Sequence, residues 1–239
     1  MTAVTRRSAQ WLVLAVLLLS LLGGLAGPPA APVAAQQPPV VISEIRIDHS
    51  GADTDEYFEL AGPPGTSLDG LTYIVLGDGS VGSGVIEAVV PLGGHTIPAS
   101  GFFVVAEISF SLGAADLEAY LNFENSDNVT HLLVQGFTGT DGQDLDIDDD
   151  GVLDETPWIA VIDKIAVIKE GNPPTTTEYH YGPPTVGPDG QFVPGHVYRC
   201  GTTWLVGPFE IGTTDTPGAP NPCQIADLAP VVMSTTPAS

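Results

Sequence analysis

The chain has 239 residues, of which 29 are acidic and only six are lysine or arginine, so its formal net charge at pH 7 is −23. Nucleic acid and anionic membranes carry charge of the same sign, so this balance argues against both as direct partners and favours cations. The 28 glycines and 22 prolines leave few windows for a helix of more than two turns. The length suffices for one large β-domain or two small ones.

Residues 1–35 have the pattern of a secretory signal peptide. Arg6 and Arg7 precede an apolar run at residues 11–22, and small residues at 33–35 supply a cleavage site. The alternative is a membrane anchor, but the apolar run is short for a spanning helix and continues into glycine and proline. We therefore expect cleavage after Ala35, a linker at residues 36–39, a secreted or cell-surface protein, and no stable membrane span in the mature chain.

The chain from residue 40 onward predicts an all-β fold. An alternating run at residues 42–47, a polar turn and a second run at residues 55–60 indicate a β-hairpin. Further strand-like runs occupy residues 71–76, 85–91, 102–106, 131–134, 158–168, 197–199 and 204–209. Strands at this spacing, without long helices between them, favour a sandwich or barrel over a parallel α/β sheet. We expect one short helix, at residues 114–120.

Two patterns associated with cofactor binding or catalysis have simpler interpretations. Residues 77–82 read G-x-G-x-x-G, but the β-branched stretch that follows is not the helix whose N-terminus would bind a pyrophosphate, so we expect a hairpin turn. The five histidines lack metal-ligand spacing, and no serine nucleophile motif is present. His49 with Glu44, or His180 with Glu178, would be the acid–base pairs to consider. We expect structural histidines and no enzyme activity.

The strongest local signal is the acidic segment at residues 141–155, which places eight acidic side chains in fifteen residues. Counted from Asp146, the acidic residues and Gly151 follow the spacing of an EF-hand calcium loop, in which a tight turn lets alternate carboxylates converge. Position twelve is Pro157, which has no carboxylate, so Glu155 or Asp144 would have to reach in. The expected ligands are Asp146, Asp148, Asp150, the carbonyl of Val152, Asp154 and Glu155. A structural Ca²⁺ is thus predicted, and a solvated acidic loop is the alternative.

The two cysteines, Cys200 and Cys223, are expected to form a disulfide, because an exported chain enters an oxidising compartment. Closing a loop of about 24 residues stabilises the fold by about 3 kcal/mol in the chain-entropy description. Trp158 and Trp204 lie in apolar runs, so we expect them in the core, and stacking on a carbohydrate is the alternative.

Several short motifs follow one another in a fixed order along residues 40–221. They are VISEI at 41–45, DEYFEL at 55–60, LDGLTY at 68–73, IPASGFFVVA at 97–106, NFENSDNVTHLLV at 122–134, VIDKIAV at 161–167 and DTPGAPN at 215–221. Together they resemble the bacterial lamin-tail domain, with insertions at 109–122 and 139–156. The resemblance implies an immunoglobulin-like β-sandwich spanning residues 40–223, with an acidic loop insertion.

The resemblance also implies a function. It points to a noncatalytic module of a bacterial extracellular protein, for adhesion, binding or targeting to an unknown cell-surface or extracellular partner. Residues 224–239 resemble the linker and first strand of a following immunoglobulin-like domain, with a frayed C-terminal tail as the alternative. The second hypothesis is the N-terminal accessory segment of an exported endonuclease/exonuclease/phosphatase-type enzyme, because proteins with this opening often continue into such a domain. A sugar-binding sandwich is a third.

Overall fold

The computed structural model describes residues 40–52, 54–79, 82–175 and 178–227. The expected signal peptide at 1–35 and linker at 36–39 lie outside the described residues, as does most of the expected C-terminal segment, at 228–239. None of the helices formed by the described residues has the length and apolar character needed to cross a membrane.

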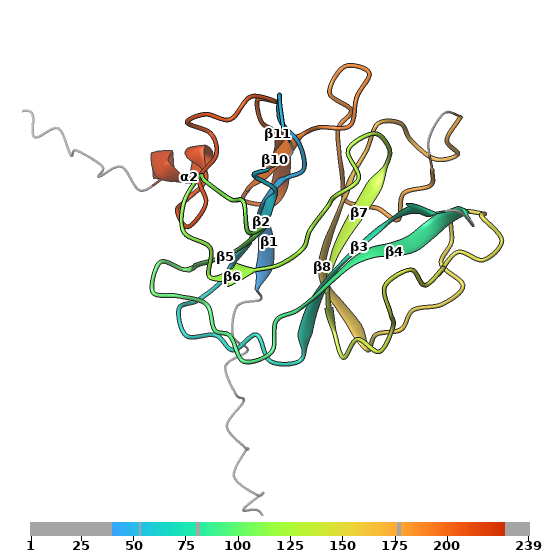
Figure 1. Ribbon diagram of the computed structural model, residues 1–239, viewed down its shortest axis with the longest axis horizontal. Helices are drawn as coiled ribbons and strands as arrows, with labels where there is room; N and C mark the ends of the chain where they lie inside the picture. The colour runs from blue at the N-terminus through green and yellow to red at the C-terminus, as the bar shows by residue number, and fades with distance from the viewer. Residues whose placement is uncertain (1–39, 53, 80–81, 176–177, 228–239) are drawn as a thin grey trace, which may run out of the picture. The chain divides into compact units, whose positions relative to one another are not determined.

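The first of two sheets has six strands in the order β11-β10-β1-β2-β5-β6 (Figure 1). Its strands are β1 (Val41–Arg46), β2 (Tyr57–Ala61), β5 (Phe102–Ala106), β6 (Leu117–Glu118), β10 (His196–Cys200) and β11 (Thr203–Val206). All neighbours are antiparallel except β5 and β6, which are parallel. The pairing of β1 with β2 confirms the hairpin predicted from the opening residues.

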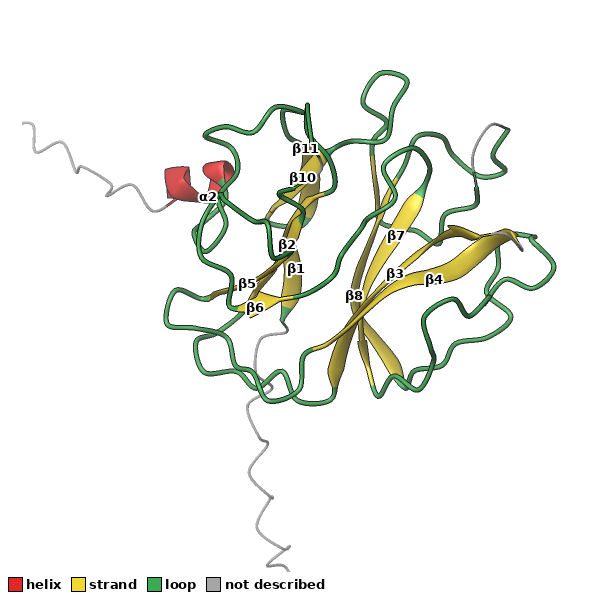
Figure 2. Ribbon diagram, in the orientation of Figure 1, coloured by secondary structure: helices red, strands yellow, loops and turns green. Residues whose placement is uncertain are grey.

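The second sheet has five strands in the order β4-β3-β7-β8-β9. Figure 2 labels β4, β3, β7 and β8 of this sheet. Its strands are β3 (Leu71–Gly79), β4 (Gly82–Pro91), β7 (Val129–Gln135), β8 (Ala160–Val167) and β9 (Thr185–Val186). Gly79 pairs with Gly82, so the glycine-rich pattern at residues 77–82 lies at the end of the β3–β4 hairpin and no helix follows it. The hairpin prediction for this pattern is confirmed.

The two sheets enclose one apolar core. Phe58 on β2 and Tyr73 on β3 stack across it with their ring centroids 3.6 Å apart. Ile45, Val105 and Ile165 are other members of this core, and each is fully buried. The molecule is therefore an all-β sandwich, because its largest apolar cluster draws side chains from both layers.

A β-bulge in β1 decides which side chains face this core. Ile42 pairs with Leu60 and Glu44 pairs with Glu59, so Ser43 is an extra residue in β1. Ile42 and Ile45 consequently reach the same core although they have opposite parity in the sequence. After the bulge, Glu44 points to the outer face of the first sheet, opposite Glu59 of β2.

The helix expected at residues 114–120 is wrong, because this stretch contains β6. Val105 of β5 pairs with Leu117, and Asp116 binds the preceding β5 residue, Val104, twice. Its amide donates to the Val104 carbonyl oxygen (2.8 Å), and its carboxylate accepts from the Val104 amide (2.9 Å). Asp116 therefore joins a sheet edge and does not begin a helix. Among the described residues the α-helix is α2 (Pro222–Asp227), which follows the last β-strand.

A second apolar cluster covers the outer face of the second sheet. Its buried residues are Ile74, Leu76, Ile86, Leu132, Val134, Leu145 and Tyr181, and the partly buried Trp158 packs against them. Leu145 belongs to the acidic segment, so this cluster fastens that segment to the sheet. Trp204, at 8% exposure, lies in the main core. Both tryptophans are thus packed against apolar clusters, as the sequence predicts.

Candidate functional site

The acidic segment is held along the outer edge of β4. The amide of Ile86 donates to the Gln143 carbonyl oxygen (2.9 Å), and the amide of Gly142 donates to the Ile86 carbonyl oxygen (2.7 Å). The amide of Leu145 donates to the Gly84 carbonyl oxygen (3.1 Å), while its side chain is fully buried. The residues after Leu145 therefore begin from a fixed point on the sandwich.

Asp146 organises the loop that follows. Its side chain is fully buried and accepts hydrogen bonds from the amides of Asp150 (3.1 Å) and Gly151 (2.9 Å) and from the hydroxyl of Tyr181 (2.7 Å). The backbone consequently wraps around this one carboxylate. Gly151 has a φ of 85°, and a Cβ atom there would lie 2.5 Å from the Tyr179 ring, so both conformation and space require glycine.

Two more carboxylates converge on Asp146. One oxygen each from Asp146, Asp148 and Asp154 lie within 4.8 Å of one another. The negative charge of Asp150 raises the pKa of Asp148, with smaller contributions from desolvation and from Asp154 and Asp146. Among the described residues, no ion pair includes a carboxylate of this loop. A cation placed between the carboxylates would relieve their repulsion.

The other expected ligands lie outside this group of three. Asp150 accepts a hydrogen bond from the Val152 amide (2.8 Å), and exposed Glu155 accepts one from the Gln143 side chain (2.9 Å). Asp144 accepts from the Asp146 amide (3.1 Å). The structure thus unites half of the predicted ligand set. Asp150 and Glu155 would need to rotate to reach an ion held by the three converging carboxylates.

The structure also forms a second acidic group that sequence reasoning missed. Oxygens of Asp78, Glu87 and Glu124 lie within 4.8 Å of one another. Burial, and then the charges of Glu124, Asp78 and Asp127, raise the pKa of Glu87 to about 8. Glu87 is the extra residue at a bulge in β4, because Ile86 pairs with Leu76 and Ala88 pairs with Val75. No local motif joins these residues, since they come from three segments.

A buried polar network covers the outer face of the first sheet. Glu44 accepts hydrogen bonds from the hydroxyls of Tyr57 (2.6 Å) and Thr216 (2.8 Å), and His196 Nε2 lies 2.7 Å from it. Arg46 Nε donates to Asp215 (2.6 Å). Thr216 and Asp215 belong to the segment before α2, so the network fastens that segment to β1, β2 and β10.

This arrangement replaces the acid–base pairs considered from the sequence. Glu44 pairs with His196, whereas His49 lies 3.9 Å from Asp55. The amide of His180 donates to the side chain of Asn172 (3.2 Å). The side chains of Glu44 and His196 are both 0% exposed, so a substrate from solvent does not reach this pair. The network therefore has the geometry of an internal anchor.

The end of the same segment is fastened at two further points. Cys200 on β10 and Cys223 in α2 lie at disulfide distance, with Cα atoms 5.9 Å apart. The side-chain amide of Asn221 donates to the carbonyl oxygens of Ser43 (3.1 Å) and Arg199 (3.0 Å). The C-terminal segment of the domain is thus tied to strands near its beginning and its end.

Comparison of the chain with protein-family models, with curated proteins and with solved structures finds no match in any of the three.

Proposed function

We propose that this chain is a secreted, noncatalytic binding module of the lamin-tail type, which serves in adhesion or targeting at a bacterial cell surface and is stabilised by Ca²⁺. The ordered motifs of the sequence support the family, and the all-β sandwich is compatible with it. The Glu44–His196 pair is buried from solvent, and this supports a noncatalytic role, because a catalytic pair must contact its substrate.

The observation that carries the calcium proposal is the convergence of Asp146, Asp148 and Asp154 without a basic partner among the described residues. Ca²⁺ prefers six to eight oxygen ligands, and a hard cation suits carboxylates. The hydrogen bonds from the amides of Asp150 and Gly151 to Asp146 preorganise the turn. Asp150, the carbonyl of Val152, Glu155 and water would complete the coordination. The role is structural, since the ion would fix this loop beside β4.

Thermal unfolding in EDTA and in excess Ca²⁺ tests this proposal. A ligand at one hundred times its Kd stabilises the native state by about 2.7 kcal/mol, which corresponds to a rise in Tm of several degrees. The double variant Asp148→Asn/Asp154→Asn should lose this rise. In EDTA it should unfold at or above the Tm of the parent, because two repelling charges are gone.

Asp141→Asn is the matched control, since Asp141 is exposed in the same acidic segment but outside the group of three. It should keep the Ca²⁺ response. An absent response in the parent, or an equal response in the double variant, would reject the metal site. For the noncatalytic role, the purified chain should not hydrolyse a phosphodiester such as bis(p-nitrophenyl) phosphate, and turnover would refute it.

A further inference from the structure

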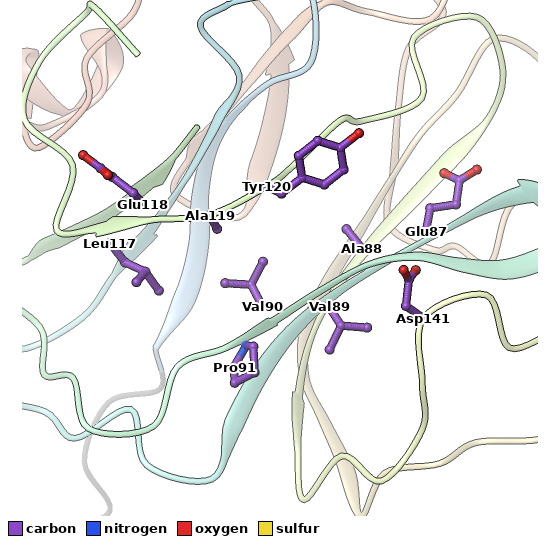
Figure 3. Close-up of a pocket in the computed structure, with 10 residues that line it drawn as sticks. All are labelled: Glu87, Ala88, Val89, Val90, Pro91, Leu117, Glu118, Ala119, Tyr120 and Asp141. Atoms are coloured by element: carbon purple, nitrogen blue, oxygen red, sulfur yellow. The ribbon is translucent and has the colours of Figure 1, made fainter. Parts of the chain in front are cut away.

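Two hollows flank the exposed side chain of Tyr120 on one side of the sandwich. The first, of about 330 Å³, lies between β4 and the segment that contains β6 (Figure 3). The second, of about 470 Å³, is lined by Glu107, Ile108 and the same segment. Both hollows are lined by residues 118–120, and we refer to the two together as the groove.

The first hollow exposes the edge of β4. Five consecutive residues of this strand, 87–91, line it, which occurs when the edge of a strand and not one face borders a cavity. β4 is the last strand of its sheet, and the acidic segment forms backbone hydrogen bonds with it at Gly84 and Ile86, on either side of a bridge between Val85 and Asp144. Among the described residues, 88–90 have no backbone partner on the side away from β3. The amide of Leu92 donates to Leu71 of β3, so by alternation along the strand it is Val89 whose amide and carbonyl point to the open side. This short edge is available for a further strand.

The groove combines an apolar floor with exposed apolar side chains. Figure 3 shows Val90 of β4 facing Leu117 and Ala119 across the first hollow. Tyr120 is 84% exposed and Ile108 is 86% exposed, the highest values among the large apolar side chains described. Such side chains at the rim of a groove are typical of a surface that another molecule covers.

The charged residues that line the groove are all acidic. They are Glu107, Glu118 and Asp141, and no lysine, arginine or histidine lines either hollow. Glu87 adds little charge at pH 7, because burial raises its pKa to about 8. Electrostatic complementarity therefore favours a positively charged ligand in this groove. A second copy of this chain fits poorly, because its own formal charge is −23.

We propose that this groove binds an extended peptide segment bearing lysine or arginine, which adds as a strand to residues 88–90 of β4. Backbone pairing supplies the register, and alternate side chains of the peptide meet the apolar floor and the acidic rim. Pro91 has no amide hydrogen and ends the available edge. This inference deepens the proposed binding role by naming its surface and the chemistry of its partner.

A fluorescein-labelled ten-residue peptide of alternating lysine and valine is the probe. Its binding to the parent is measured by fluorescence anisotropy at low and moderate salt, in EDTA and in Ca²⁺. We expect saturable binding that weakens with salt, and a peptide of alternating glutamate and valine should not bind. Methylation of every second backbone nitrogen keeps the charge of the peptide but removes the pairing donors, and should abolish binding.

Tyr120→Ala should weaken binding at least tenfold, and Glu118→Gln/Asp141→Asn severalfold. Phe192→Ala is the control, since Phe192 is 73% exposed and lines neither hollow, and it should bind like the parent. Unchanged affinity in Tyr120→Ala, equal binding of the methylated peptide, self-association through this face or binding of an oligosaccharide in place of the peptide would overturn the proposal. The Ca²⁺ response uses other residues, so either proposal can fail alone.

Discussion

Glu59 provides the most direct test of how the buried polar network is held. It lies on β2 with 0% exposure, and one carboxyl oxygen accepts a hydrogen bond from the Gly218 amide (2.7 Å). The other oxygen has no hydrogen-bond partner among the described residues. Burial, followed by the charge of Glu44, raises the pKa of Glu59 from 4.5 to about 8.

The direction of the pH effect follows from this shift. Because the folded state holds the proton more tightly than the unfolded state, the contribution of Glu59 is most favourable below pH 4.5 and is lost as the pH rises towards 8. Each pKa unit corresponds to about 1.4 kcal/mol, so ionisation of the unfolded state would lower the free energy of unfolding by roughly 3 kcal/mol at pH 7.

The variant Glu59→Gln removes the ionisation and keeps the size of the side chain. Urea unfolding followed by tryptophan fluorescence at pH 5, 6, 7 and 8, in EDTA, gives the free energy of unfolding of variant and parent. The difference between them should shift in favour of the variant by about 1 kcal/mol per pH unit. Glu87 and the other carboxyls that do not interact with Glu59 are common to both proteins and cancel. A difference that stays constant from pH 5 to 8 would refute the reasoning.

Two further predictions concern other buried groups. Burial lowers the pKa of His131 to about 3, so the stability that depends on its neutral form should be lost as the pH falls from 6.5 towards 3. Urea unfolding at pH 6 and pH 4 should therefore show a smaller loss of unfolding free energy in His131→Gln than in the parent. Tyr181→Phe removes the hydroxyl that donates to Asp146, so the free energy of unfolding measured in urea should fall by about 1.5–3 kcal/mol. Calorimetry should also show weaker Ca²⁺ binding. An unchanged Ca²⁺ affinity would show that this hydrogen bond does not position the loop.

The strands were predictable because their signal is local. Alternation in residues 42–47 and 55–60 and the glycines at 77–82 specify hairpins through neighbouring residues, and the structure has both. The bulge at Ser43 was not predictable, because it depends on the register between two strands. The helix prediction at 114–120 failed since an aspartate near an apolar run suits a helix start, and only tertiary pairing with Val104 reveals the alternative.

The same distinction applies to the sites. Asp146, Asp148 and Asp154 lie within nine residues, so their spacing in the sequence is enough to predict that they share a cation. Glu44 and His196 are 152 residues apart, and the sheet order that joins them is not visible in the sequence. The alternating polar residues of β1 indicate a solvated face, but the segment before α2 covers that face. When a segment distant in the sequence buries one face of a strand, the alternation of residues in that strand does not reveal it.

The place of β1 within its sheet has a consequence for the order in which the domain is completed. Its neighbour on one side, β2, follows within about a dozen residues, whereas its neighbour on the other side, β10, is synthesised about 150 residues later. An N-terminal hairpin formed early would therefore keep one row of backbone donors and acceptors open until β10 follows, and such a row attracts other chains. Glu44 and Arg46, whose charges stay in water until β10 and the segment before α2 arrive, would protect the nascent hairpin from association during that interval.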